Sequence, residues 1–154
     1  MDKAENKLTI AEIENYEGVK YEPDNNAEYP LVIWYNKIRS KYILELNDGD
    51  VAKLIRQELF LKYIVPEAIR RLKKNPTIGE LYTGEMLTAL YKLDNTFWID
   101  NKALLKEVQN LLNELEEDSK AIKNLEWLYE GEKREFHDKV KLFDEKLSRM
   151  GLNK

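Results

Sequence analysis

The side chains that could do chemistry in this chain of 154 residues are few. The one histidine, His137, stands beside an apolar stripe with no candidate nucleophile near it, and the three serines lie outside any nucleophile motif. Glu80 and Glu85 are two carboxylates of the kind that glycoside hydrolysis uses, but their sequence spacing does not fix the separation that this reaction needs. A glycine-rich phosphate loop and a His-Glu-x-x-His motif are both absent from the sequence. We therefore predict that the protein is not an enzyme and has no catalytic or cofactor-binding residue.

The cysteine and histidine counts bear on metal binding and on the compartment. With no cysteine and one histidine, the chain cannot form a disulfide framework or a thiolate metal site, and most imidazole-based metal sites are excluded as well. No apolar run approaches the roughly 20 residues of a membrane span, and residues 1–7 lack the apolar core of a signal peptide. We expect a soluble, cytoplasmic protein with no metal, no small-molecule substrate and no membrane partner.

The charge changes sign along the chain. The net charge is −4, but residues 1–30 carry −5, 31–76 carry +5, 77–118 carry −6 and 119–154 carry +2. Two interpretations stay open: acidic and basic segments can pair inside the fold and on solvated helix faces, or an acidic face can meet a basic partner. The net negative charge argues against direct nucleic-acid binding, because proteins that bind nucleic acids are usually basic.

Apolar residues recur at spacings of three and four, and only six glycines and four prolines interrupt the chain. This pattern predicts an all-α fold, with one compact helical domain over 1–154 that contains about six to seven helices. Thr9 and Glu12 have the spacing of a capping box, which predicts a short helix within an N-terminal acidic arm, 1–29. A second helix is expected over 31–40.

The most apolar helix is expected over 51–74, at the centre of the domain. Asn47-Asp-Gly-Asp50 before it predicts a turn with an N-cap and not a calcium loop, because the terminal Glu of an EF-hand is missing. Pro66 removes a backbone donor and is expected to kink the helix. Arg70–Lys74 place four positive charges at its end, which suits either a nucleic-acid-binding surface or a favourable interaction with the helix dipole.

A loop is expected over 79–84 and a helix over 85–93. A turn over 94–100 then leads to a further helix over 101–117. The C-terminal segment 119–154 predicts either one long helix bent near Gly131 or two helices. Its apolar stripe, Phe136–Met150, supports an alternative function for the chain as a helical adaptor or structural subunit that assembles through this stripe.

A series of short blocks follows one another in a distinctive order. The blocks are Asn15-Tyr-Glu-Gly18, Tyr29-Pro-Leu-Val32, Asp50-Val-Ala-Lys-Leu-Ile-Arg-Gln57, Leu59-Phe-Leu-Lys-Tyr-Ile-Val-Pro66, Asn75-Pro76, Gly79-Glu-Leu-Tyr-Thr-Gly-Glu-Met-Leu87 and Phe97-Trp98. Together they cover roughly residues 10–115 and resemble the immunity proteins of bacterial contact-dependent growth inhibition systems. Within them, Glu80, Tyr82 and Glu85 keep a Gly-acidic-x-Tyr-x-Gly-acidic pattern typical of that family.

The resemblance implies a small cytoplasmic protein that binds the C-terminal toxin domain of a neighbouring cell's surface adhesin and blocks it. Such toxins are often nucleases that frequently cut tRNA, so the expected partner is a basic nuclease domain. The expected mechanism is occlusion of the toxin's active site or substrate groove by acidic and aromatic side chains.

By charge and position, we expect the toxin-binding residues to be Glu80, Tyr82, Glu85, Asp94 and Trp98. Structural alternatives stay open for three of these side chains. Trp98 could equally fill a gap between helices, and the two glutamates could equally stabilise a helix N-terminus.

Overall fold

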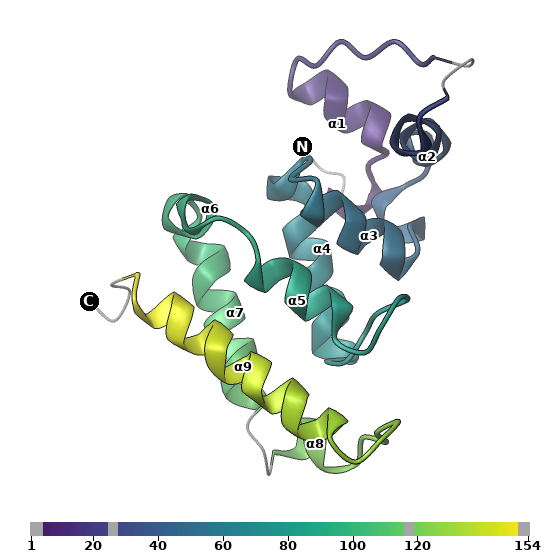
Figure 1. The fold of residues 1–154 in the computed structure, drawn as a ribbon. Coiled ribbons are helices and arrows are strands. Elements are labelled where there is room, and N and C mark those ends of the chain that lie inside the picture. Colours follow the sequence, from purple (N-terminus) through teal and green to yellow (C-terminus); the bar gives the residue numbers. More distant parts are fainter. Residues whose placement is uncertain (1–4, 25–27, 116–118, 151–154) are drawn as a thin grey trace.

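The computed structural model describes residues 5–24, 28–115 and 119–150, and these residues are arranged in helices (Figure 1). Within them there are nine α-helices, two short 3-10 helices and no strand. Seven of the α-helices have seven residues or more, which confirms the all-α prediction and its number of main helices. In chain order the elements are η1 (Glu5–Lys7), α1 (Ile10–Tyr16), α2 (Pro30–Ile38), η2 (Ile43–Glu45), α3 (Asp48–Arg56), α4 (Leu61–Lys74), α5 (Glu85–Tyr91), α6 (Asn95–Asp100), α7 (Lys102–Glu114), α8 (Lys120–Lys123) and α9 (Glu132–Ser148).

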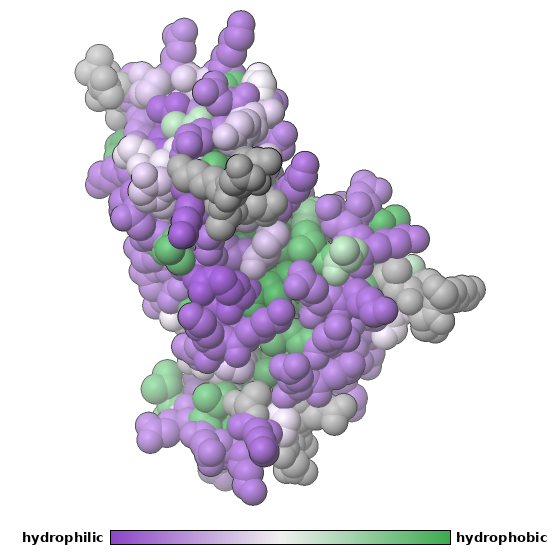
Figure 2. Space-filling model, turned by 180° about the vertical axis from the view of Figure 1, so that it is seen from behind, coloured by the Kyte–Doolittle hydropathy of each residue, from purple (hydrophilic) through white to green (hydrophobic). Residues whose placement is uncertain are grey.

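Helices α3, α4 and α5 pack on one another at the centre of the molecule (Figure 1). Beyond α3 lie α1 and α2, and at the opposite end α9 returns alongside α7. Figure 2 views the molecule from behind, where apolar side chains gather in a strip along the seam between α4 and α7. One cluster of buried apolar side chains extends from Leu8 to Leu147, so helices from all parts of the described chain contribute to the core.

Three helices begin at residues that the sequence marks as helix starts, although α3 starts at Asp48, inside the expected turn 47–50 and before the expected start at 51. The backbone N–H of Glu12 donates to Thr9 Oγ1 at 3.0 Å and the N–H of Thr9 donates to Glu12 Oε1 at 2.9 Å, which completes the capping box of α1. Asn47 Oδ1 accepts the N–H of Asp50 at 2.7 Å and caps α3. Pro30 opens α2 at a position where the missing donor costs no hydrogen bond.

The continuous helix expected over 51–74 is in fact two helices. α3 ends at Arg56 and α4 begins at Leu61, whereas Pro66 lies inside α4 without ending it. The interruption therefore falls several residues before the proline that was expected to cause it.

The end of α3 explains this difference. The N–H of Leu59 donates to the C=O of Leu54 at 3.0 Å and the N–H of Glu58 donates to the C=O of Ile55 at 2.9 Å, a pair of bonds that defines a Schellman motif. Glu58 has a φ of 54°, the left-handed conformation that glycine usually supplies at this position. Because no glycine stands there, no local sequence signal marks the end of the helix.

A short helix, α6, replaces the turn expected over 94–100. Asp94 caps it by accepting the N–H of Thr96 at 2.9 Å. The next helix, α7, begins at Lys102, one residue after its expected start, and ends at Glu114. Residues 116 and 117, which were expected to complete it, lie outside the described residues.

The C-terminal segment forms two helices of very unequal length. α8 is a single turn and α9 begins after Gly131, so the two-helix alternative describes the chain. The apolar stripe of α9 is buried, with exposures of at most 8% for Phe136, Val140, Phe143 and Leu147. Because these side chains pack inside the fold, the adaptor alternative loses the surface through which it would assemble.

The basic run at the end of α4 is largely paired with carboxylates of the described chain. Arg71 donates to Glu67 at 2.6 Å and to Asp48 at 2.9 Å, and Arg70 donates to the same Glu67 at 2.7 Å. Lys73 also has a carboxylate partner, on α7 at 3.7 Å. Three of the four cations are thus paired, which leaves little of this run for nucleic acid.

Candidate functional site

The segment between α4 and α5 forms a tight loop, residues 77–84. The N–H of Gly84 donates to the C=O of Thr77 at 2.8 Å and closes it. Gly84 has a φ of 82°, which favours glycine. Gly79 has no room for a side chain, because a Cβ there would lie 2.0 Å from the carbonyl oxygen of Tyr82. The loop geometry therefore requires both glycines of the family-like pattern.

Glu85 holds this loop from inside the protein. Its fully buried carboxylate accepts the N–H of Glu80 at 2.8 Å, the N–H of Leu81 at 3.1 Å and the guanidinium of Arg56 at 2.9 Å. Burial by itself raises the pKa of a carboxyl group, but these donors outweigh it and hold the pKa of Glu85 below its ordinary value. Glu85 is therefore a buried, charged acceptor for the loop backbone.

Glu80 occupies the outer side of the same loop. Its carboxylate accepts the N–H of Gly49 at the N-terminus of α3, where the helix dipole favours negative charge. The residue remains exposed, so it also adds negative charge to this face. Glu80 thus stabilises the N-terminus of a helix, as the structural alternative expected, and that helix is α3.

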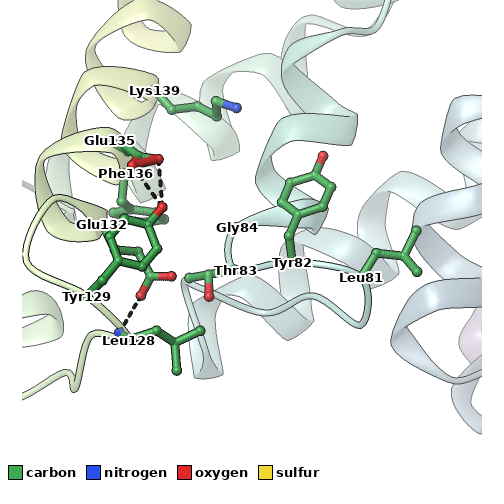
Figure 3. Close-up of a pocket in the computed structure, with 10 residues that line it drawn as sticks. All are labelled: Leu81, Tyr82, Thr83, Gly84, Leu128, Tyr129, Glu132, Glu135, Phe136 and Lys139. Carbon is green, nitrogen blue, oxygen red and sulfur yellow. Dashed lines mark hydrogen bonds between the residues drawn. The ribbon is translucent and has the colours of Figure 1, made fainter.

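The loop turns two large apolar side chains outward. Leu81 is 76% exposed and Tyr82 is 49% exposed. Across a cleft of about 410 Å³, the chain that leads into α9 exposes Leu128 and Tyr129 (Figure 3). Large exposed apolar side chains gathered in one place mark sites of contact with another protein.

Carboxylates predominate among the charged side chains that line this cleft. Glu132 and Glu135 are the acidic residues and Lys139 is the cation. The Tyr129 hydroxyl donates to Glu135 Oε1 at 2.8 Å, and the N–H of Leu128 donates to Glu132 Oε1 at 2.9 Å (Figure 3). Glu132 is only 7% exposed, so Glu135 is the exposed carboxylate of this wall, and the three charged side chains together carry a formal charge of −1, which suits a basic partner.

Asp94 and Trp98 belong to a different part of the molecule. Both lie at α6, which follows α5, whereas the 77–84 loop precedes α5 (Figure 1). Asp94 is exposed at the start of α6. Trp98 is fully buried, with its ring centre 5.1 Å from that of Phe97 and 5.9 Å from that of Phe143.

The five expected site residues therefore do not form one surface. Glu80, Tyr82 and Glu85 lie together at the N-terminal end of α5, and of these only the first two are exposed. Trp98 has no exposed surface with which to contact a partner, and the gap-filling alternative describes its position.

Half of the cleft comes from residues that sequence reasoning missed. The spacing of Ile122, Leu125 and Tyr129 predicts a helix with Tyr129 on its apolar side, but α8 ends at Lys123 and the tyrosine lies in the following loop, 53% exposed. Glu132 and Glu135 have no distinguishing local pattern. They reach the 77–84 loop only because α9 folds back beside α7.

The described residues contain no group of three or more His, Asp or Glu side chains that could hold a metal ion. Nor does any helix in the described part of the chain have the length and apolar character needed to cross a membrane.

Large exposed apolar side chains gathered around a cleft are typical of a protein that binds another protein. Comparison with protein families agrees: residues 15–108 match the CDI immunity proteins, where CDI stands for contact-dependent growth inhibition. This match covers more than half of the chain, and the chain belongs to that family. Its role is the neutralisation of a toxin, and its partner is the cognate toxin protein. A comparison with curated individual proteins returned no match.

Proposed function

We propose that the chain neutralises a basic nuclease toxin by occlusion, with the 77–84 loop and the neighbouring cleft covering the toxin's active site or substrate groove. The observation that best supports this proposal is the set of large exposed apolar side chains around an acidic cleft, namely Leu81, Tyr82, Leu128 and Tyr129. Apolar side chains of this size supply buried contact area, and carboxylates supply charge complementarity.

A nuclease suits this face because it must attract phosphate groups. A groove that binds RNA or DNA is lined with Lys and Arg, and an acidic protein surface can compete for it. A toxin that cuts tRNA is one such partner. Neutralisation would then take place in the cytoplasm, and no catalytic step by the immunity protein is required.

The proposal assigns different roles to the expected site residues. Tyr82 is the aromatic anchor, since half-exposed tyrosines combine apolar area with a hydroxyl at low entropic cost. Glu80 and Asp94 supply exposed negative charge that speeds encounter with a basic toxin. Glu85 positions the loop from beneath and does not touch the partner.

Binding to the purified toxin domain, measured by titration calorimetry, tests this assignment. Tyr82→Ala combined with Leu81→Ser should raise the dissociation constant by about 10-fold or more, because two anchors are lost. Both side chains are exposed, so the fold should keep its thermal midpoint. Leu142→Ser is the matched control, since Leu142 is 49% exposed on α9 outside the cleft. Equal affinities for the two variants would move the interface away from the loop.

A further inference from the structure

Helix α2 has an unusual distribution of apolar side chains. Its sequence, Pro30-Leu-Val-Ile-Trp-Tyr-Asn-Lys-Ile38, is rich in large apolar residues, yet Ile38 is its only buried residue. Leu31 and Ile33 are 42% and 41% exposed. A helix of this composition normally faces a core, so α2 presents apolar surface that nothing in the described chain covers.

Two hydrogen bonds tie α2 to its neighbours, in addition to the contacts that Trp34, Tyr35 and Ile38 make with the core. The Tyr35 hydroxyl donates to Glu14 Oε2 at 2.6 Å, which ties the helix to α1. The indole N–H of Trp34 donates to Asp50 Oδ1 at 2.8 Å, which ties it to α3. The helix is thus fixed in position with much of its apolar surface still exposed.

This surface forms one wall of an apolar groove of about 480 Å³, here called the α2 groove. Its apolar lining includes Val19, Tyr21, Leu31, Trp34, Leu59 and Phe60. All of these residues fall within the segment that matches the family. A groove of this kind can seat large apolar side chains of a partner.

The opposite wall contains two backbone outliers. Glu58 and Phe60 line the groove with φ values of 54° and 51°, although neither is glycine. Left-handed backbone at such residues costs free energy and clusters at binding sites, where it fixes the shape of a surface. The turn between α3 and α4 therefore holds the Phe60 ring in the groove wall at a cost in backbone strain.

The segment that supplies most of the groove lining carries an excess of acidic side chains, here called the acidic rim. Residues 17–35 carry four acidic side chains and one basic side chain, Lys20. Glu17, Glu22 and Glu28 are exposed, and no ion pair joins them to another residue of the described chain. Two cations contact rings of the lining. Lys53 lies 4.6 Å from the ring centre of Trp34, and Arg39, which is paired with Glu14, lies 4.9 Å from that of Tyr21. Glu58, which lines the groove, adds a further negative charge, so acidic side chains stay in excess.

The charge decides which partner the groove fits. A second copy of this chain would bring an equally acidic rim against the first, and like charges oppose such pairing. A segment with a large apolar side chain and Lys or Arg beside it would satisfy both the groove and the rim. The basic toxin of the proposed function can supply such a segment.

We propose that the α2 groove is a second docking site, which takes a basic-flanked apolar segment of the toxin-bearing chain. This inference rests on the proposed function and adds a contact remote in sequence from the cleft. The two contacts have different kinetic roles: the acidic rim raises the association rate, and the apolar groove lowers the dissociation rate.

Dissociation kinetics with the purified toxin domain test the inference. Leu31→Ser and, as a second variant, Val19→Ser should each speed dissociation by about 10-fold with little change in association rate. Both side chains are more than 40% exposed, so circular dichroism should show an unchanged fold. Leu142→Ser again serves as the control and should dissociate like the wild type.

If the wild-type chain binds tightly and both groove variants dissociate at the same rate as the wild type, the docking site is overturned and the proposed function stands. A wild-type chain that fails to bind the toxin domain would overturn both. Light scattering of the free protein tests the other possible occupant, a second copy of this chain. A dimer that becomes a monomer in the Leu31→Ser variant would show that the groove binds a second copy and would contradict this inference.

Discussion

At the scale of single residues, the turn between α3 and α4 carries the clearest strain. Glu58 closes the Schellman motif with a left-handed backbone. Its side chain is exposed, and no other described residue forms an ion pair with it. The left-handed backbone at Glu58 therefore costs free energy, and the side chain makes no ion pair with the described chain that would offset it.

Glycine at this position should stabilise the protein. Glu58→Gly relieves a left-handed conformation that costs an L-residue about 1–2 kcal/mol, partly offset by the entropy of glycine in the unfolded chain, so we expect a gain of about 0.5–1 kcal/mol. Urea unfolding measures it. Gln57→Gly is the control, because Gln57 has a φ of −84° and glycine there relieves nothing. A loss of stability for Glu58→Gly would show that this side chain makes a contribution that the contacts do not reveal.

Residue types alone could not separate exposed from buried acids. Glu80 and Glu85 look alike in the sequence, yet one is exposed and the other accepts three hydrogen bonds with no exposed surface. Reversing the charge at Glu85 would leave backbone donors and Arg56 without their acceptor. Tests of binding at this loop are therefore informative at Glu80 and Tyr82 and uninformative at Glu85.

At the scale of elements, buried or nearly buried glutamates join helices that are apart in the chain. The pairs are Glu14 of α1 with Arg39 after α2, Glu67 of α4 with Asn6 of η1, and Glu85 of α5 with Arg56 of α3. In each case burial raises the pKa of the carboxyl group, but the hydrogen bonds donated to it outweigh burial and leave the pKa lowered.

These glutamates predict the pH dependence of stability. A carboxyl group with a lowered pKa in the folded state stabilises the fold above its unfolded pKa, about 4.5, and loses that contribution as the pH falls through the folded value. The free energy of unfolding should thus decrease steadily below about pH 5. Glu14→Gln should be less stable at neutral pH and less sensitive to acid. An unfolding free energy that stays constant from pH 6 to pH 3 would contradict this account.

Helix starts were predictable because their signals are local. Thr9, Asn47 and Pro30 begin helices through contacts within a few residues of themselves. The end of α3 was not predictable, because a glutamate takes the left-handed position of the Schellman motif where a glycine would have signalled the helix end. The single turn of α8 is a further case, since the helical spacing of Ile122, Leu125 and Tyr129 continues through residues that the fold leaves in a loop.

At the scale of the whole molecule, the candidate site is assembled from distant segments. The sequence predicted a loop over 79–84 with its tyrosine, most of the 77–84 loop, and the match over residues 15–108 confirms the family. The other wall of the cleft belongs to α9, outside that match, and only the folded chain brings it beside the loop. Sequence patterns thus predicted the kind of protein and half of its proposed surface.

The central claim is that this chain disarms a toxin by binding it, and survival of cells that express the toxin domain tests it most directly. Cells that also produce the wild-type chain should grow, and the two proteins should co-purify. Protection should weaken with Tyr82→Ala and Leu81→Ser together and persist with Leu142→Ser. Equal killing with and without the wild-type chain, and no co-purification, would contradict the account.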